Sequence, residues 1–133
     1  LVELVAETLM QSPLHRAAVV CGSGNYDEVT PIGPTKMALL QNGTLTPMML
    51  DPQEFGIPSC SVDDLAVSGK EEAVAVLNDI LDGHGPRAMM DMVVLNVGLA
   101  IYLLEEKMDM ALCMARAREA VSAGVGRKVL HAA

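Results

Sequence analysis

The spacing of apolar residues predicts strands in the first half of the chain and helices in the second. Residues 1–11 place apolar side chains on one helical face, which predicts the end of an amphipathic helix that Ser12-Pro13 stops. Residues 17–21, AAVVC, form a short unbroken apolar run. Such a run is typical of a strand that is buried on both faces and has parallel neighbours. We expect those neighbours to lie in sequence outside this chain.

A hairpin is predicted after the glycine-rich loop 22–28. The segments TKMALLQ and TLTPMML flank Asn42-Gly43, the strongest short turn signal. Pro47 cannot donate a backbone hydrogen bond, so its strand is expected at an edge of the sheet. Residues 51–69 are predicted as a loop that Phe55 attaches to the core.

Three helices are predicted in the second half. Ser68 and Glu71 have the spacing of a capping box, and the helix that they open ends at Gly83. Pro86 opens an apolar helix that runs to about residue 106. A last amphipathic helix is predicted from Asp109 to Gly124.

The apolar helix after Pro86 is predicted to lie in a protein core. Asp91 and Asn96 interrupt its apolar run, which leaves the uninterrupted part too short for a membrane span. Asn96 is expected to be a satisfied core amide that bonds a loop carbonyl, and Arg116, Arg118 and Glu119 to form a solvated helix face.

Composition limits the class of protein. The chain has 133 residues, enough for one domain, and 51% of them are hydrophobic, which excludes a chain disordered by composition. The formal net charge of −8 argues against binding to nucleic acid or to an anionic membrane surface. The acidity fits a soluble cytoplasmic protein.

The cysteines and histidines exclude two further kinds of site. Cys21, Cys60 and Cys113 are widely spaced without a CxxC pair, and only three histidines are present, so the usual zinc patterns are missing. A disulfide framework is not indicated, which favours a reducing compartment. Cys21 is expected to be a small buried hydrophobe in preference to a reactive thiol.

The adjacent carboxylates Asp27 and Glu28 are the candidate chemistry of the chain. They lie in the loop at the carboxyl end of the predicted strand 17–21, where α/β sheets bind ligands. Gly22 and Gly24 would let the backbone approach a ligand closely. Mg²⁺ commonly binds through one or two carboxylates, waters and a substrate phosphate. From spacing alone, a solvated loop is the commoner interpretation of such a turn.

The order of several separated motifs resembles one enzyme family. The stretch VVCGSGNYDEVTPIGPTKMALLQNGTL is similar to the anthranilate phosphoribosyltransferase family, which carries VHG-x-x-G-x-DE followed by GPT. DPQEFGIP matches the family's P-x-x-F-G segment, and the helical half and the ALCMARAREAVSAGVGRKVL ending also match in order. The resemblance covers the whole chain.

The resemblance implies a fold, a reaction and a site. Members transfer a phosphoribosyl group from phosphoribosyl pyrophosphate to anthranilate in tryptophan biosynthesis, and they are usually homodimers. Asp27 and Glu28 fall on the family's Mg²⁺-binding pair. Residues 1–133 are then the C-terminal portion of the α/β domain of the phosphoribosyltransferase and nucleoside-phosphorylase type, a strand plus a hairpin with several packed helices. The N-terminal helical domain and the phosphate-binding loops are absent, so the isolated chain is expected to be inactive.

Two departures leave alternatives open. Cys21 stands where the family usually has His, and Asn25-Tyr26 replace the usual Gly-Leu or Gly-Met before the acidic pair. A non-catalytic binding relative of the same fold and a pyrimidine-nucleoside phosphorylase-like enzyme are the other interpretations. The first fits less well because such relatives tend to lack the pair, and the second because it matches the order of YDE and GPT less closely.

Overall fold

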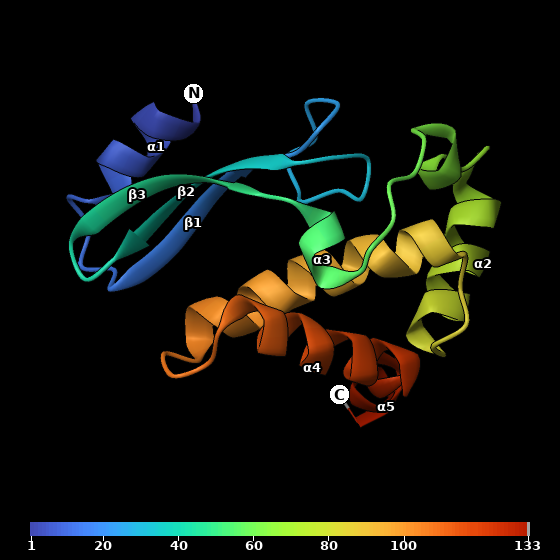
Figure 1. Cartoon of the computed structure of the whole chain (residues 1–133). Helices are drawn as coiled ribbons and strands as arrows, with labels where there is room; N and C mark the ends of the chain where they lie inside the picture. Colours follow the sequence, from blue (N-terminus) through green and yellow to red (C-terminus); the bar gives the residue numbers. More distant parts are fainter. Residues whose placement is uncertain (133) are drawn as a thin grey trace.

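The computed structural model describes residues 1–132 as an antiparallel sheet with helices on both of its faces (Figure 1). One short helix covers one face, and a layer of longer helices covers the other (Figure 1). The α/β class is confirmed. The helices and strands are α1 (Val2–Leu9), β1 (Arg16–Cys21), β2 (Thr35–Gln41), β3 (Thr44–Leu50), α2 (Lys70–Leu81), α3 (Arg87–Leu104), α4 (Met110–Ser122) and α5 (Val125–Ala132).

The three strands form one sheet in the order β1-β2-β3 with antiparallel pairing throughout. Val19 pairs with Ala38, and Ala38 pairs on its other side with Pro47. The prediction of parallel neighbours for residues 17–21 is therefore wrong on the side that β2 occupies, and a parallel neighbour from outside this chain at the other edge of β1 stays a prediction. An unbroken apolar run reports burial of both faces, and it does not report the direction of the partner strand.

Both faces of β1 are covered, as its apolar run predicted. Ala18 and Val20 pack against the core that β2, α3 and α4 share. Val19 and Cys21 point to the opposite face, where they pack against the cluster of Val2 and Ala6 on α1. The period of two along the strand thus divides the protein into a main core and a smaller one under α1. Cys21 belongs to the smaller core, as expected for a small hydrophobe.

The hairpin prediction is confirmed. Asn42 and Gly43 have φ angles of 50° and 77°, the left-handed conformation that a tight two-residue hairpin turn requires. Pro47 lies on β3, which is an edge strand among the described residues. An edge strand has a partner on one side only, so it can accept a proline, which has no N–H to donate.

The segment 51–69 contains two short 3₁₀ turns that the loop prediction missed. Asp51 caps the first turn, Pro52–Phe55, by accepting a hydrogen bond from the Gln53 N–H at 3.0 Å. The second turn covers Asp63–Leu65. Phe55 packs against the main core, which confirms its predicted role.

The helix ends follow the predicted signals with small corrections. The predicted capping box of Ser68 and Glu71 is wrong: Gly69 is the N-cap residue of α2 and makes no side-chain cap bond, and the Ser68 N–H donates to the Glu72 carboxylate at 2.6 Å. Gly83 has a φ of 86° just after α2, and Asp109 caps α4 by accepting a hydrogen bond from the Leu112 N–H at 2.7 Å. The helix α5 was not predicted, because Gly124 ends α4 and the chain then starts a new helix at Val125.

The central helix α3 packs closely on α4. A Cβ atom on Gly98 would lie 3.1 Å from Met114 Cα, tighter than most real contacts, and would also displace the Met114 side chain, so glycine favours this approach. The helix is long and apolar enough to cross a membrane by length and composition alone. In the structure its residues Val94, Leu95 and Leu99 are buried in the main core, which is the position predicted for it.

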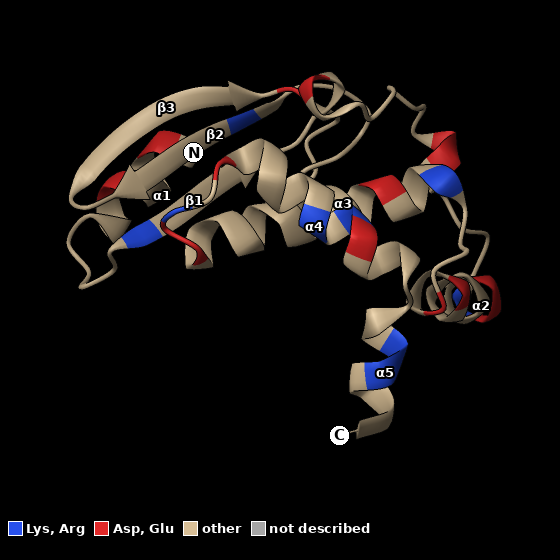
Figure 2. Cartoon of the chain, turned by 60° about the horizontal axis from the view of Figure 1, so that its bottom comes forward, with Lys and Arg blue, Asp and Glu red and all other residues tan. Residues whose placement is uncertain are grey.

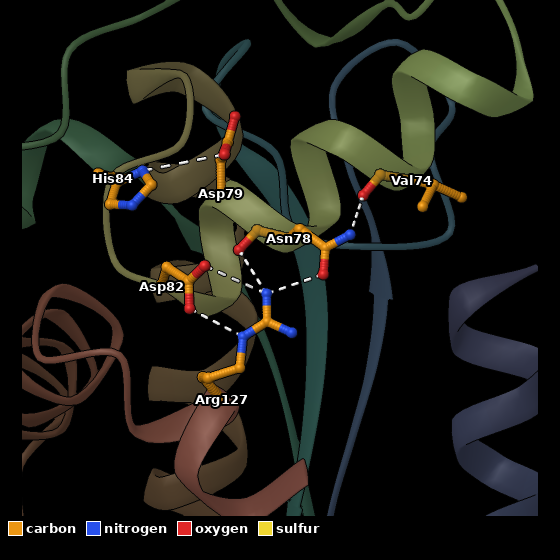
Figure 3. Close-up of polar contacts among 6 residues, drawn as sticks. All are labelled: Val74, Asn78, Asp79, Asp82, His84 and Arg127. Carbon is orange, nitrogen blue, oxygen red and sulfur yellow. Dashed lines mark hydrogen bonds and ion pairs between the residues drawn. The ribbon is translucent and has the colours of Figure 1, made fainter. Parts of the chain in front are cut away.

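The terminal helix α5 is joined to α2 by one arginine (Figure 3). Arg127 donates from Nε to Asp82 Oδ1 at 2.8 Å and from Nη2 to Asp82 Oδ2 at 3.2 Å. The same Nη2 also donates to the Asn78 side-chain oxygen at 2.8 Å. This hydrogen bonding holds the pKa of Asp82 below its ordinary value.

We expect Arg127→Gln to lower the melting temperature at pH 7 more than Lys128→Gln, which removes an equal charge from an exposed position of the same helix. The depressed pKa of Asp82 makes its contribution complete above the ordinary Asp value of about 4. That contribution is lost as the pH falls through the lowered pKa. The difference between wild type and Arg127→Gln should therefore shrink in acid, and thermal melts followed by circular dichroism at several pH values check this. Equal melting temperatures at pH 7 would contradict it.

Candidate functional site

The glycine-rich loop after β1 folds back on itself in a tight turn. The Gly22 N–H donates to the Tyr26 carbonyl at 2.9 Å, and the Asn25 N–H donates to the Gly22 carbonyl at 3.1 Å. Gly24 and Asn25 have φ angles of 82° and 62°, which this turn requires. Asp27 follows directly after this closed turn, so the turn fixes the position of the backbone at the start of the acidic pair.

Gly22 lies against the backbone of Glu28. A Cβ atom at position 22 would lie 2.2 Å from the Glu28 carbonyl oxygen, a distance that no side chain tolerates. The obstacle is backbone, which cannot rotate away as a side chain could. Glycine is therefore needed here so that the strand end and the acidic pair can lie in contact.

The residues after the pair are buried. Val29, Thr30 and Pro31 follow Glu28 directly, and both Val29 and Thr30 have no exposed surface. Asn96 on α3 contacts Val29 with both ends of its side-chain amide: Oδ1 accepts from the Val29 N–H at 3.0 Å, and Nδ2 donates to the Val29 carbonyl at 2.7 Å. The prediction that Asn96 is a satisfied core amide bonded to a loop carbonyl is confirmed.

The Gly33-Pro34-Thr35 corner is tied to the same turn. Ser23 Oγ donates to the Pro34 carbonyl at 2.9 Å, and Thr30 Oγ1 donates to the Ser23 carbonyl at 3.3 Å. These two bonds join the turn, the buried segment and the start of β2. The loop that carries the acidic pair is therefore held to these neighbouring segments by hydrogen bonds.

Both carboxylates of the acidic pair are exposed. Within residues 1–132, neither Asp27 nor Glu28 forms an ion pair or a side-chain hydrogen bond. Asp27 lines a shallow hollow with Tyr26 and Val62, and Glu28 lines a neighbouring one with Met92 and Asn96. Both side chains are thus available to a ligand.

The donor set of the loop fits one kind of metal. No group of three or more His, Cys, Asp or Glu side chains able to hold a metal occurs in the described part of the chain. Two oxygen donors without a third protein ligand do not make a closed metal cage. They fit Mg²⁺, which keeps several waters and takes further oxygens from a phosphate ligand.

Two of the three cysteines are disfavoured as nucleophiles. Burial raises the pKa of the Cys60 and Cys113 thiols, which disfavours the nucleophilic thiolate. Cys60 lies beside the loop, and its N–H donates to the Pro31 carbonyl at 3.1 Å. Its contact is thus made by the backbone and supports the segment behind the acidic pair.

Sequence reasoning missed a charged cluster that supports the helical layer. Asp91 on α3 is buried and lies 3.5 Å from Arg118 on α4 and 3.5 Å from Arg87. Arg118 also donates to the Phe55 carbonyl at 3.1 Å. The expectation that Arg118 belongs to a solvated helix face is therefore wrong, and its partners are too distant in sequence for a local pattern to reveal them.

The chain belongs to the glycosyl transferase family, a/b domain, whose family profile matches residues 1–127. Curated relatives within that family include anthranilate phosphoribosyltransferases. The enzyme of Nitratidesulfovibrio vulgaris is 48% identical over 137 residues, covering 99% of this chain and 40% of the relative. That of Oleidesulfovibrio alaskensis is 41% identical and covers 96% of the chain and 39% of the relative. The predicted resemblance is confirmed, and the chain spans about two-fifths of the length of these relatives.

Solved structures agree with the fold. Anthranilate phosphoribosyltransferase from Thermus thermophilus is 26% identical, with a TM-score of 0.77 over 87% of this chain and 34% of that protein. The Saccharomyces cerevisiae enzyme in complex with PRPP and Mg is 22% identical, with a TM-score of 0.81 over 98% of the chain and 38% of that protein. The latter likeness supports the fold alone.

Proposed function

We propose that the protein carrying this chain transfers a phosphoribosyl group from phosphoribosyl pyrophosphate (PRPP) to the amine of anthranilate and releases pyrophosphate. The reaction belongs to tryptophan biosynthesis. The proposal depends on one observation. Asp27 and Glu28 are two carboxylates without partners among the described residues, and hydrogen bonds hold their loop in place at the end of β1. The identity of 48% to an anthranilate phosphoribosyltransferase supports it.

Asp27 and Glu28 would hold Mg²⁺ at the pyrophosphate end of PRPP. The bound ion would stabilise negative charge on the departing pyrophosphate. The chain itself supplies the placement: Gly22 allows the strand end to contact Glu28, and Asn96 fixes the residue that follows the pair. The yeast enzyme, which shares the fold, is described in complex with PRPP and Mg.

We also propose where this chain lies in the whole protein, where the protein is found and how it assembles. Residues 1–133 form a C-terminal portion of the α/β domain, and a helical domain and phosphate-binding loops elsewhere in the protein complete the site. The protein is a cytoplasmic homodimer that binds neither nucleic acid nor membranes. Figure 2 shows Lys and Arg residues spread over the sheet, the α3–α4 layer and α5 without gathering on one element. The absence of a basic face among the described residues supports the proposal that the protein does not bind nucleic acid.

An assay of the full-length natural protein tests the proposal. With anthranilate, PRPP and Mg²⁺ present, we expect anthranilate fluorescence to fall as product forms. The isolated 133-residue chain should leave the fluorescence unchanged, because two carboxylates alone cannot bind both substrates. A full-length protein that does not consume anthranilate would contradict the substrate assignment, and turnover by the isolated chain would contradict the assignment as part of a larger site.

A further inference from the structure

Asn96 makes one more hydrogen bond than a loop contact needs. Besides its two bonds to Val29, Nδ2 donates to the Met92 carbonyl one turn earlier in α3 at 2.9 Å. Both amide protons and the oxygen are therefore used, and only one orientation of the amide satisfies all three partners. The side chain is fixed to its own helix while it holds the loop.

The two bonds satisfy both backbone groups of Val29, as a neighbouring strand would in a sheet. The Val29 N–H and carbonyl are both bound by one side chain, at 3.0 and 2.7 Å, and Val29 has no exposed surface. Buried backbone groups of this kind need partners, since an unpaired one costs about 1–3 kcal/mol. A leucine side chain at this position could satisfy neither group.

The acidic pair lies between two fixed residues. Tyr26 precedes the pair, and its carbonyl accepts the Gly22 N–H at 2.9 Å. Val29 follows the pair and is held by Asn96. Only Asp27 and Glu28 lie between these fixed points, so the loop has little freedom to move their backbone.

We propose that Asn96 is a positioning residue for the Mg²⁺ site: by binding both backbone groups of Val29, it connects the rigid helix α3 to the acidic pair. This inference rests on the proposed function of the pair. Asn96 acts through the backbone and is not a metal ligand. Contacts outside the ligands commonly change metal affinity or activity by about 10–100-fold, and we expect the lower end of this range.

Two measurements on the full-length natural protein test the proposal. The first is hydrogen exchange of peptides covering residues 22–30, followed by mass spectrometry. The second is the Mg²⁺ concentration that gives half-maximal PRPP binding in calorimetry. Asn96→Leu should speed exchange in the loop and raise the Mg²⁺ requirement about tenfold. Should the leucine variant fail to fold, Asn96→Ala is expected to show the same two effects, because alanine is well tolerated in helices.

Met114→Ala is the matched control. It removes a buried side chain from α4, at the contact with Gly98, and so lowers the melting temperature without removing a bond to the loop. We expect its loop exchange and Mg²⁺ requirement to stay near wild type. An Asn96 variant with wild-type exchange and wild-type Mg²⁺ requirement would overturn the inference, as would a Met114→Ala protein that needs as much Mg²⁺ as Asn96→Leu. If wild type itself bound PRPP without any dependence on Mg²⁺, the proposed function of the pair would fail as well.

Discussion

Replacing both Asp27 and Glu28 by their amides should lower the transferase activity of the full-length protein by about 100-fold or more at millimolar Mg²⁺. Asp27→Asn with Glu28→Gln keeps the size of both side chains and removes their charge. The exposed pair makes no side-chain bonds among residues 1–132, so the fold should be retained. The loss should appear as a higher Mg²⁺ requirement together with a lower kcat. Initial rates measured over a range of Mg²⁺ concentrations check both.

The control for this variant removes two negative charges elsewhere. Glu7→Gln with Glu119→Gln changes exposed residues of α1 and of α4. This protein should keep wild-type rates, because charges at a distance are screened by salt. Equal losses in the two double variants would mean that net charge, and not the acidic pair, governs the activity.

Gly22→Ala should damage both stability and activity. Its Cβ would lie 2.2 Å from the Glu28 carbonyl oxygen, so the loop must move away from the end of β1. Overpacking of this kind costs about 1–3 kcal/mol of the free energy of unfolding. The same movement displaces Glu28, so the Mg²⁺ requirement should rise. Urea unfolding and Mg²⁺-dependent rates measure the two effects.

Gly69→Ala serves as the matched control for Gly22→Ala. A Cβ atom at position 69 meets nothing within 4 Å, and the backbone there is extended. Gly69 is the N-cap residue of α2, where alanine is less favourable than glycine, so the free energy of unfolding should fall by less than about 1 kcal/mol. If Gly22→Ala were as stable and as active as Gly69→Ala, the close contact between β1 and Glu28 would be needed neither for stability nor for activity.

Local patterns predicted the elements whose signals are themselves local. The Asn42-Gly43 turn, the Asp109 cap and the end of α2 at Gly83 all depend on residues a few positions apart. The direction of β1 could not be predicted in this way, because an apolar run records burial and not the partner strand. Helix α5 was missed because a glycine that ends one helix does not exclude another directly behind it.

The candidate site was predicted in part. The residues of the pair followed from the sequence and from the family resemblance, but Gly22 was expected to let the backbone approach a ligand, and only the structure shows that it lies against the Glu28 backbone. The sequence also indicated that Asn96 bonds a loop carbonyl, but it could not say that the loop is the one that carries the pair. That contact joins residues 67 positions apart, and only the fold brings them together. The pairing of buried Asp91 with Arg118 was hidden for the same reason.

The most direct test of the central claim is a calorimetric titration of the full-length protein with PRPP, with and without Mg²⁺. The claim is that Asp27 and Glu28 bind the metal on the pyrophosphate. We predict that Mg²⁺ tightens PRPP binding to wild type and that this gain is lost in the Asp27→Asn, Glu28→Gln variant. Equal tightening by Mg²⁺ in both proteins would contradict the claim and leave the acidic pair as a solvated turn.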